Sequence, residues 1–157
     1  MVAMRITNGA YIIDSLGKIL ITHPTNHPMT TWSIPKGLSD LEETSKESAI
    51  RETLEETNLD LYLYLDVTTY KDMGTENYGH NKKKLRAHLF YIDLPLSESD
   101  MDLTCRSMFI CDYTGFELAE NDITKWMDIK FARDFLHYSQ QSILKKVDDL
   151  LARDIIK

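Results

Sequence analysis

Runs of β-branched and aromatic residues predict a β-hairpin at the start of the chain. Two such runs, Ala3–Ile13 and Lys18–Thr22, are separated by the turn-forming residues Asp14–Gly17. A loop with two prolines follows, and Trp32–Ile34 predicts a third, short strand. The N-terminal part of the chain is therefore expected to contribute several strands to a sheet.

The next segment carries the signals of an α-helix over Ser45–Thr57. Thr44 and Glu47 have the spacing of a capping box, in which each side chain accepts a hydrogen bond from the backbone N–H of the other residue. Asn58 stands where a residue in the left-handed conformation can end the helix. The residues of its moderately apolar face, which suits packing, are Ala49, Ile50, Thr53, Leu54 and Thr57.

Alternation of apolar and polar positions predicts further strands in the middle of the chain. These strands are expected at Leu59–Val67, Lys84–Leu94 and Met101–Tyr113. The polar stretch Asp72–Asn81 is predicted to be a loop, and so is the acidic stretch Glu117–Asp122. The middle of the chain is therefore expected to supply the remaining strands of the sheet.

The C-terminal part predicts an amphipathic helix after Trp126. Its apolar residues recur at helical spacing, at Ile143, Leu144, Val147, Leu150 and Leu151. Strands and helices thus mix along the chain without a regular β–α–β alternation. This favours an α+β fold, an α/β/α sandwich with a mixed sheet flanked by helices, over a doubly wound parallel sheet.

Length and charge narrow the class of protein. The 157 residues suit a single domain over residues 1–157, and 43% hydrophobic residues can form a core. A net charge of −7 argues against a surface that binds nucleic acid or anionic lipid along its whole extent. No apolar run reaches the roughly 20 residues that span a bilayer, and no secretory signal is present. We expect a soluble, cytoplasmic protein that does not bind membranes.

The two cysteines agree with that expectation. Cys105 and Cys111 lie in a predicted strand, which would separate their Cα atoms by roughly 20 Å. A disulfide needs about 4.4–6.8 Å. They are therefore predicted to be free and buried.

Three glutamates share one face of the helix predicted at Ser45–Thr57. Glu52 precedes Glu55 by three residues and Glu56 by four, so their side chains are neighbours on the helix surface. Like charges at this spacing are unfavourable unless something neutralises them. A divalent cation with oxygen ligands, Mg²⁺ or Mn²⁺, is the natural candidate. The alternative is an ordinary acidic face in contact with water.

A wider pattern around these glutamates resembles the signature of the Nudix hydrolases. The six residues that match its spacing are Gly37, Glu43, Arg51, Glu52, Glu55 and Glu56. Two positions depart from the family pattern, since Thr53 replaces a usual aliphatic residue and Asn58 replaces a usual glycine. Neither departure removes a carboxylate, and Asn58 can still provide the left-handed cap.

The resemblance implies a Mg²⁺- or Mn²⁺-dependent pyrophosphohydrolase that cleaves a nucleoside diphosphate linked to another moiety. It implies that Glu52, Glu55 and Glu56 are metal ligands, that one of them can act as base, and that the backbone carbonyl of Lys36 adds a ligand. Arg51 and Glu43 are expected to form a supporting ion pair. The family often adds a carboxylate from a late loop, and we select Glu120 over Glu117 and Asp122.

The segment Pro35–Gly37 resembles that of Nudix enzymes that cleave dinucleoside polyphosphates or capped RNA. We therefore predict a dinucleoside polyphosphate such as diadenosine tetraphosphate as substrate. Lys36, Lys84 and Arg86 are candidate contacts for its phosphates, and Tyr78 is a candidate to stack on a base.

Several alternatives remain open at this point. They are removal of pyrophosphate or a cap from the 5′ end of RNA, hydrolysis of ADP-ribose or a nucleoside triphosphate, and a Nudix-fold module that senses a nucleotide without cleaving it. The sequence leaves the bond cleaved, the number of metal ions and the oligomeric state undetermined.

Overall fold

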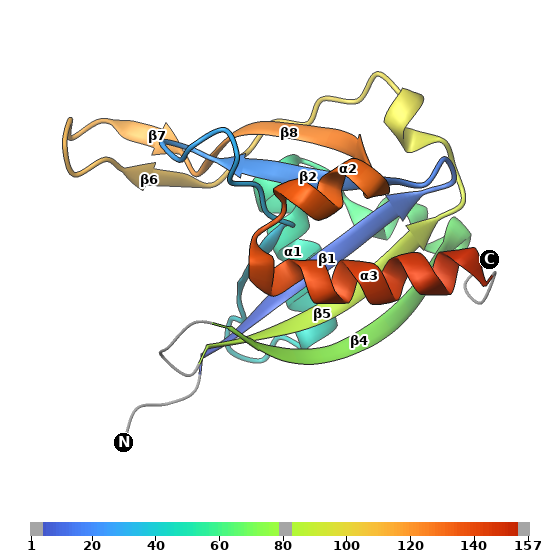
Figure 1. Cartoon of the computed structure of the whole chain (residues 1–157). Helices are drawn as coiled ribbons and strands as arrows, with labels where there is room; N and C mark the ends of the chain where they lie inside the picture. The colour runs from blue at the N-terminus through green and yellow to red at the C-terminus, as the bar shows by residue number, and fades with distance from the viewer. Residues whose placement is uncertain (1–4, 79–82, 154–157) are drawn as a thin grey trace.

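A mixed β-sheet forms the middle layer of the computed structural model, which describes residues 5–78 and 83–153 (Figure 1). Its strands are β1 (Arg5–Asp14), β2 (Lys18–Pro24), β3 (Lys36–Leu38), β4 (Thr68–Tyr78), β5 (Lys83–Ile92) and β8 (Asn121–Asp128). Their order is β4-β5-β1-β2-β8, and β3 pairs beside β1. β1 and β5 are parallel and the other pairs are antiparallel.

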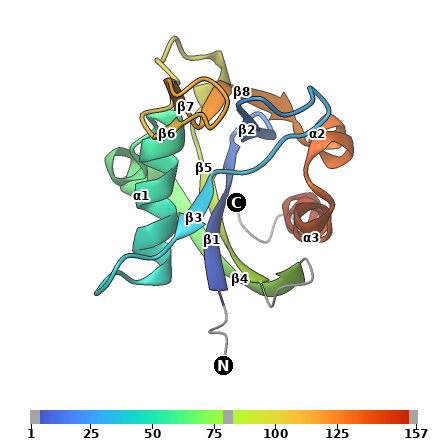
Figure 2. The ribbon, with the colours of Figure 1, turned by 90° about the vertical axis from the view of Figure 1, so that its left-hand side faces the viewer.

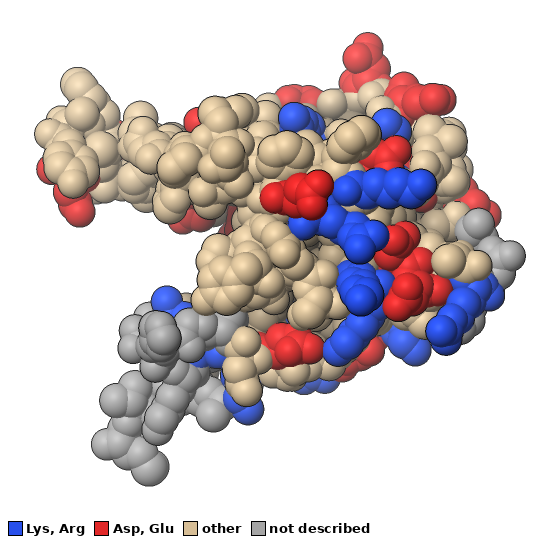
Figure 3. All heavy atoms as spheres, in the orientation of Figure 1, with Lys and Arg blue, Asp and Glu red and all other residues tan. Residues whose placement is uncertain are grey.

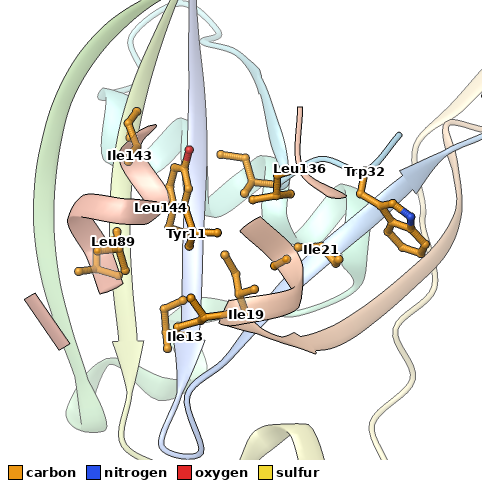
Figure 4. Packing of buried hydrophobic residues seen from close by; sticks show 14 of the residues in the cluster. Tyr11, Ile13, Ile19, Ile21, Trp32, Leu89, Leu136, Ile143 and Leu144 are labelled. Atoms are coloured by element: carbon orange, nitrogen blue, oxygen red, sulfur yellow. The ribbon is translucent and has the colours of Figure 1, made fainter. Parts of the chain in front are cut away.

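Helices cover both faces of this sheet (Figure 2). α1 (Ser45–Thr57) lies on one face, and α2 (Ile129–Phe135) and α3 (Tyr138–Ala152) lie on the other. Figure 4 shows Ile143 and Leu144 of α3 packed over Tyr11 and Leu89 of the sheet. The predicted α+β class, with a mixed sheet flanked by helices, is confirmed. No helix among the described residues is long and apolar enough to cross a membrane.

α1 forms as its sequence predicts. The Thr44 side chain accepts from the Glu47 N–H, the Glu47 side chain accepts from the Thr44 N–H, and both distances are 3.1 Å. Asn58 ends the helix at φ 66°, in the left-handed region. The hydroxyl of Thr53 donates to the carbonyl of Ala49 at 2.7 Å, so this buried polar group is satisfied within the helix.

The strand predicted at Leu59–Val67 is wrong. Leu61–Val67 forms a 3₁₀ helix, η1, because the side chain of Asp60 accepts a hydrogen bond from the N–H of Tyr62 and caps it. Leu59 and Leu61 are buried, whereas Leu63 is 75% exposed. Alternation of leucines here does not correspond to alternating burial.

The loop predicted at Asp72–Asn81 is also wrong, because residues 72–78 belong to β4 and residues 79–81 lie outside the described part. β4 is an edge strand, so its polar residues can face water. Gly74 has φ 84° at a shift in register, where Asp72 Oδ1 accepts its N–H at 2.9 Å. Trp32–Ile34 is likewise not a strand: Trp32 and Ser33 form isolated bridges, and β3 begins at Lys36.

The region after β5 differs from its predicted strand and loop. After the short 3₁₀ helix η2 (Leu96–Glu98), the stretch Met101–Tyr113 is extended only at β6 (Met108–Ile110). The predicted acidic loop forms β7 (Glu117–Ala119) and the start of β8. β6 and β7 make an arm that projects from the sheet (Figure 1). Both cysteines are free and buried, as predicted.

The left-handed end of α1 gives a prediction about stability. Asn58→Ala should have a lower free energy of unfolding than Asn58→Gly by about 1 kcal/mol, because alanine is strained at positive φ and glycine is not. Both variants lose the hydrogen bond from the Asn58 amide to the carbonyl of Asp102, so their difference isolates the backbone. Urea denaturation measures it, and equal stability would contradict the assigned cap.

Candidate active site

Arg51 is the centre of a network that joins α1 to the segment before it. Its Nε donates to Glu43 at 2.8 Å, and its Nη2 donates to the carbonyl of Leu38 at 2.9 Å. Its Nη1 donates to Glu52 at 3.0 Å and to Glu55 at 3.1 Å. The predicted ion pair between Arg51 and Glu43 is confirmed. Asp40 also lies 3.4 Å from Nε of Arg51. One guanidinium thus faces four carboxylates, so acidic side chains outnumber basic ones in this cluster.

Glu52 packs directly against the backbone of β3. A Cβ added to Gly37 would lie 2.1 Å from Cδ of Glu52, so only glycine allows this approach. Burial raises the pKa of Glu52 to about 7, against the opposing effect of Arg51, and the charges of Glu55 and Glu120 raise it further. Glu52 is therefore a sheltered carboxylate whose charge is only partly compensated.

Glu56 points away from Arg51, toward the sheet. It is 7% exposed, and its two oxygens accept from the backbone N–H of Lys36 at 3.3 Å and from Nδ2 of Asn121 at 3.2 Å. Burial raises its pKa to about 8, although both hydrogen bonds oppose this. A buried carboxylate with neutral donors alone favours a proton or a cation nearby.

The donor chemistry of these side chains fits a divalent cation. Carboxylate oxygens are the ligands that Mg²⁺ and Mn²⁺ prefer, and Glu52, Glu55 and Glu56 supply them. A cation would also offset the cost of burying Glu52 and Glu56. Over residues 5–78 and 83–153, no three His, Cys, Asp or Glu side chains are already gathered around one point. Arg51 holds two of the glutamates instead, so a cation would compete with it for them.

A pocket of about 400 Å³ opens beside this cluster. At one end it is lined by Glu56, Glu120, Asn121 and Lys36, and its other lining residues include His27, Thr31, Trp32, Leu85, His137, Ser139 and Gln140. Burial lowers the pKa of His137, and the positive charge of Lys36 lowers it further. The pocket therefore joins a carboxylate end, which also contains Lys36, to walls with aromatic, imidazole and hydroxyl groups.

His23 fixes the loop that forms one wall of the pocket. Its Nδ1 lies 2.6 Å from Asp122, and its Nε2 lies 3.0 Å from the carbonyl of Pro28. Burial lowers its pKa, but these two partners outweigh burial and the net pKa is raised. Its ring also meets Trp32 edge to face at 5.2 Å. The loop between β2 and β3 is thus held by a buried histidine that contacts the partly exposed Asp122 and the carbonyl of Pro28.

The structure brings together most of the residues predicted for the site. Glu52, Glu55 and Arg51 form one cluster, and Lys36 lies at the pocket together with Glu56. Of the three late acids considered, Glu120 lines the pocket, whereas Asp122 binds His23 and Glu117 is exposed on β7.

Lys84 and Arg86 do not line the pocket. Leu85 does, and successive residues of a strand point to opposite faces, so its two neighbours face the other way. Arg86 is paired with Asp72 at 2.5 Å. The side chain of Tyr78 lies outside the described part of the structure.

Sequence reasoning missed Asn121, His137 and Gln140. His137 and Gln140 reach the pocket from the junction of α2 and α3, far along the chain from α1, and no local pattern marks them. Asn121 directly follows Glu120, but its amide is not among the carboxylates predicted as ligands in this region. The sequence feature that could have identified Asn121 is its position next to Glu120, not the chemistry of its side chain.

The chain belongs to the Nudix family, because the family's NUDIX domain pattern matches residues 4–139. Nucleoside diphosphate-linked moiety X motif 6 of Xenopus laevis is 26% identical over 122 residues. This match covers 78% of the chain and 48% of the relative, so the chain spans about half the length of that protein.

Solved structures share the fold. A C. elegans Ap4A hydrolase binary complex superimposes with a TM-score of 0.67 at 21% identity, over 95% of this chain and 98% of that one. The NUDIX domain of Shewanella oneidensis NrtR, complexed with ADP ribose, superimposes with a TM-score of 0.68 at 14% identity, over 96% of this chain and 90% of that one. The predicted Nudix fold is confirmed.

The close approach of Gly37 and Glu52 gives a prediction about metal binding. Gly37→Ala should displace the Glu52 carboxylate and weaken Mn²⁺ binding by about 10-fold or more, with the free energy of unfolding changed by no more than about 1 kcal/mol. Titration of free Mn²⁺ by electron paramagnetic resonance measures the affinity. In a Glu52→Ala background the same change should have no further effect. An additional loss there would show that Gly37 acts by another route.

The buried Glu56 carboxyl gives a prediction about pH. Its folded pKa is about 8 against an ordinary 4.5, so between these values the folded state binds more protons than the unfolded state. Its contribution to stability is complete below pH 4.5 and is lost as pH rises through 8. Without divalent cations, the free energy of unfolding of the wild type should fall across this pH range by at least about 2 kcal/mol more than that of Glu56→Gln. Each pKa unit corresponds to about 1.4 kcal/mol. Urea denaturation across this range tests it, and a constant difference would contradict the shift.

Proposed function

We propose that the protein hydrolyses a nucleoside diphosphate linked to another moiety, with Mg²⁺ or Mn²⁺ bound by Glu52, Glu55 and Glu56. The observation that carries this proposal is the position of two sheltered carboxylates, with pKa values of about 7 and about 8, beside a pocket of about 400 Å³. Family membership and the Xenopus relative support the same class of substrate.

The side chains around the carboxylates have separate roles in this proposal. When bound by these glutamates, a divalent cation would neutralise charge on the diphosphate and would lower the pKa of the attacking water. Before a cation binds, Arg51 holds Glu52 and Glu55 and is itself anchored by Leu38 and Glu43. The backbone carbonyl of Lys36 would add a further ligand. One of the glutamates accepts the proton of the water.

Two other residues extend the site toward the substrate. Glu120 lies close enough to raise the pKa of Glu52, and we assign it as an additional carboxylate at the catalytic centre. Lys36 lines the pocket next to Glu56, where its ammonium can contact a phosphate oxygen of the substrate. The free cysteines support a reducing compartment such as the cytoplasm.

The preferred substrate in this proposal is a dinucleoside polyphosphate such as diadenosine tetraphosphate. The segment Pro35–Gly37 and the likeness to a C. elegans Ap4A hydrolase support this choice. ADP-ribose is the second candidate, favoured by the likeness to a NUDIX domain complexed with ADP ribose. Hydrolysis of a nucleoside triphosphate stays a further alternative.

Two alternatives have less support. On the face shown in Figure 3, Lys and Arg gather over α2 and α3 but alternate with Asp and Glu, so that face offers no continuous basic track for RNA. Contacts with RNA beyond its 5′ end therefore find no continuous basic surface on this face. A sensing module that does not cleave its nucleotide is disfavoured because every carboxylate of the signature is present.

A release assay tests this proposal. Diadenosine tetraphosphate, ADP-ribose, nucleoside triphosphates and 5′-triphosphorylated or capped RNA are incubated with the protein and Mg²⁺. We expect cleavage of diadenosine tetraphosphate, its loss on chelation, and a fall of at least about 100-fold in Glu55→Gln/Glu56→Gln. Cleavage of RNA alone would overturn the substrate, and nucleotide binding without cleavage would favour the sensing module.

A further inference from the structure

Glu56 is held by two hydrogen-bond donors of different kinds. Its Oε1 accepts from the backbone N–H of Lys36, which any residue except proline would supply at that position. Its Oε2 accepts from Nδ2 of Asn121 at 3.2 Å, in a buried environment. Within the described part of the chain, Asn121 is the one side chain that donates a hydrogen bond to Glu56. The orientation of this carboxylate therefore depends on the identity of residue 121.

An irregularity in the sheet directs Asn121 toward the site. His23 pairs with Ile123 and Pro24 pairs with Asn121, so Asp122 is an extra residue in β8. Such bulges change the direction of a side chain. Both sides of the bulge are fixed, because Asp122 binds His23 at 2.6 Å and the carbonyl of Glu120 accepts from the N–H of Thr25 at 3.0 Å. Asn121 is 8% exposed and lies in the pocket wall.

The surroundings of Asn121 favour an amide donor at this position. Its Nδ2 also lies 3.9 Å from Sγ of Cys105, so it faces two acceptors at once. Cys105 belongs to the segment whose next two residues donate their N–H groups to the carbonyl of Glu55, at the end of α1. An apolar residue of the same size would leave Glu56 without this donor. The amide thus ties β8 to the glutamates of α1.

From these contacts we infer that Asn121 is a positioning residue, which holds the Glu56 carboxylate in the orientation that receives the divalent cation. The inference rests on the proposed function. A ligand that is already oriented loses less conformational freedom on binding a metal, and partners of metal ligands commonly affect affinity by about 10- to 100-fold. Asn121 acts through Glu56 rather than on the substrate itself.

Asn121→Leu removes the donor and keeps the size of the side chain. We expect Mn²⁺ affinity, measured by electron paramagnetic resonance without substrate, to fall about 10-fold or more. The value of kcat should fall with little change in KM, because leucine keeps the size of the side chain at this position of the pocket wall. A thermal unfolding curve shows whether Asn121→Leu folds. If it does not fold, Asn121→Ala provides the same comparison.

The matched control is Asn8→Ala, which removes another buried amide whose partners are Ser39 and His88 rather than Glu56. It should lower the temperature of unfolding and leave Mn²⁺ affinity unchanged. Folded Asn121 variants with wild-type Mn²⁺ affinity would overturn the inference, and so would a wild type that binds no Mn²⁺. Wild type that binds Mn²⁺ but cleaves no nucleotide would overturn the proposed function alone.

Discussion

Removal of glutamate side chains from water is the constraint on which the rest of this structure depends. Glu52 lies against β3 and Glu56 lies in the pocket wall, and burial is the largest cause of both raised pKa values. Carboxylates in such places are costly unless donors or cations surround them. Arg51 supplies one charge, and Asn121 supplies a neutral hydrogen bond. A divalent cation would neutralise the negative charge that these two partners leave uncompensated.

The parts of the site that follow local rules could be predicted from the sequence. α1 is set by its capping box and by Asn58, and its glutamates come together because helical spacing places them on one face. The contact of Arg51 with Glu43 also lies within one short segment. Two elements were predicted less well, for different reasons. The cap that Asp60 provides two residues away at Tyr62 favours η1 over a strand, and this local signal was outweighed by the alternation of leucines. The polar stretch that forms β4 is a strand because it pairs with β5, which is distant in sequence.

The pocket could not be predicted from the sequence either. Its walls combine the loop after β2, the start of β8 and the junction of α2 and α3, which are far apart in sequence. No periodicity connects His27 with His137, and the bulge that aims Asn121 arises only when β2 pairs with β8. Lys84 and Arg86 were candidates because of their charge, but they flank Leu85 on β5 and face away from the pocket that Leu85 lines. The signature on α1 thus identifies the family, whereas the pocket walls, drawn from elsewhere, are the place to seek selectivity.

The most direct test is the structure of the protein crystallised with Mn²⁺, with anomalous diffraction to locate the ion. We predict a peak within about 2.0–2.3 Å of carboxylate oxygens of Glu52, Glu55 and Glu56, with Arg51 displaced from Glu52 and Glu55. An empty cluster at saturating Mn²⁺, with Arg51 still bound to Glu52 and Glu55, would contradict it.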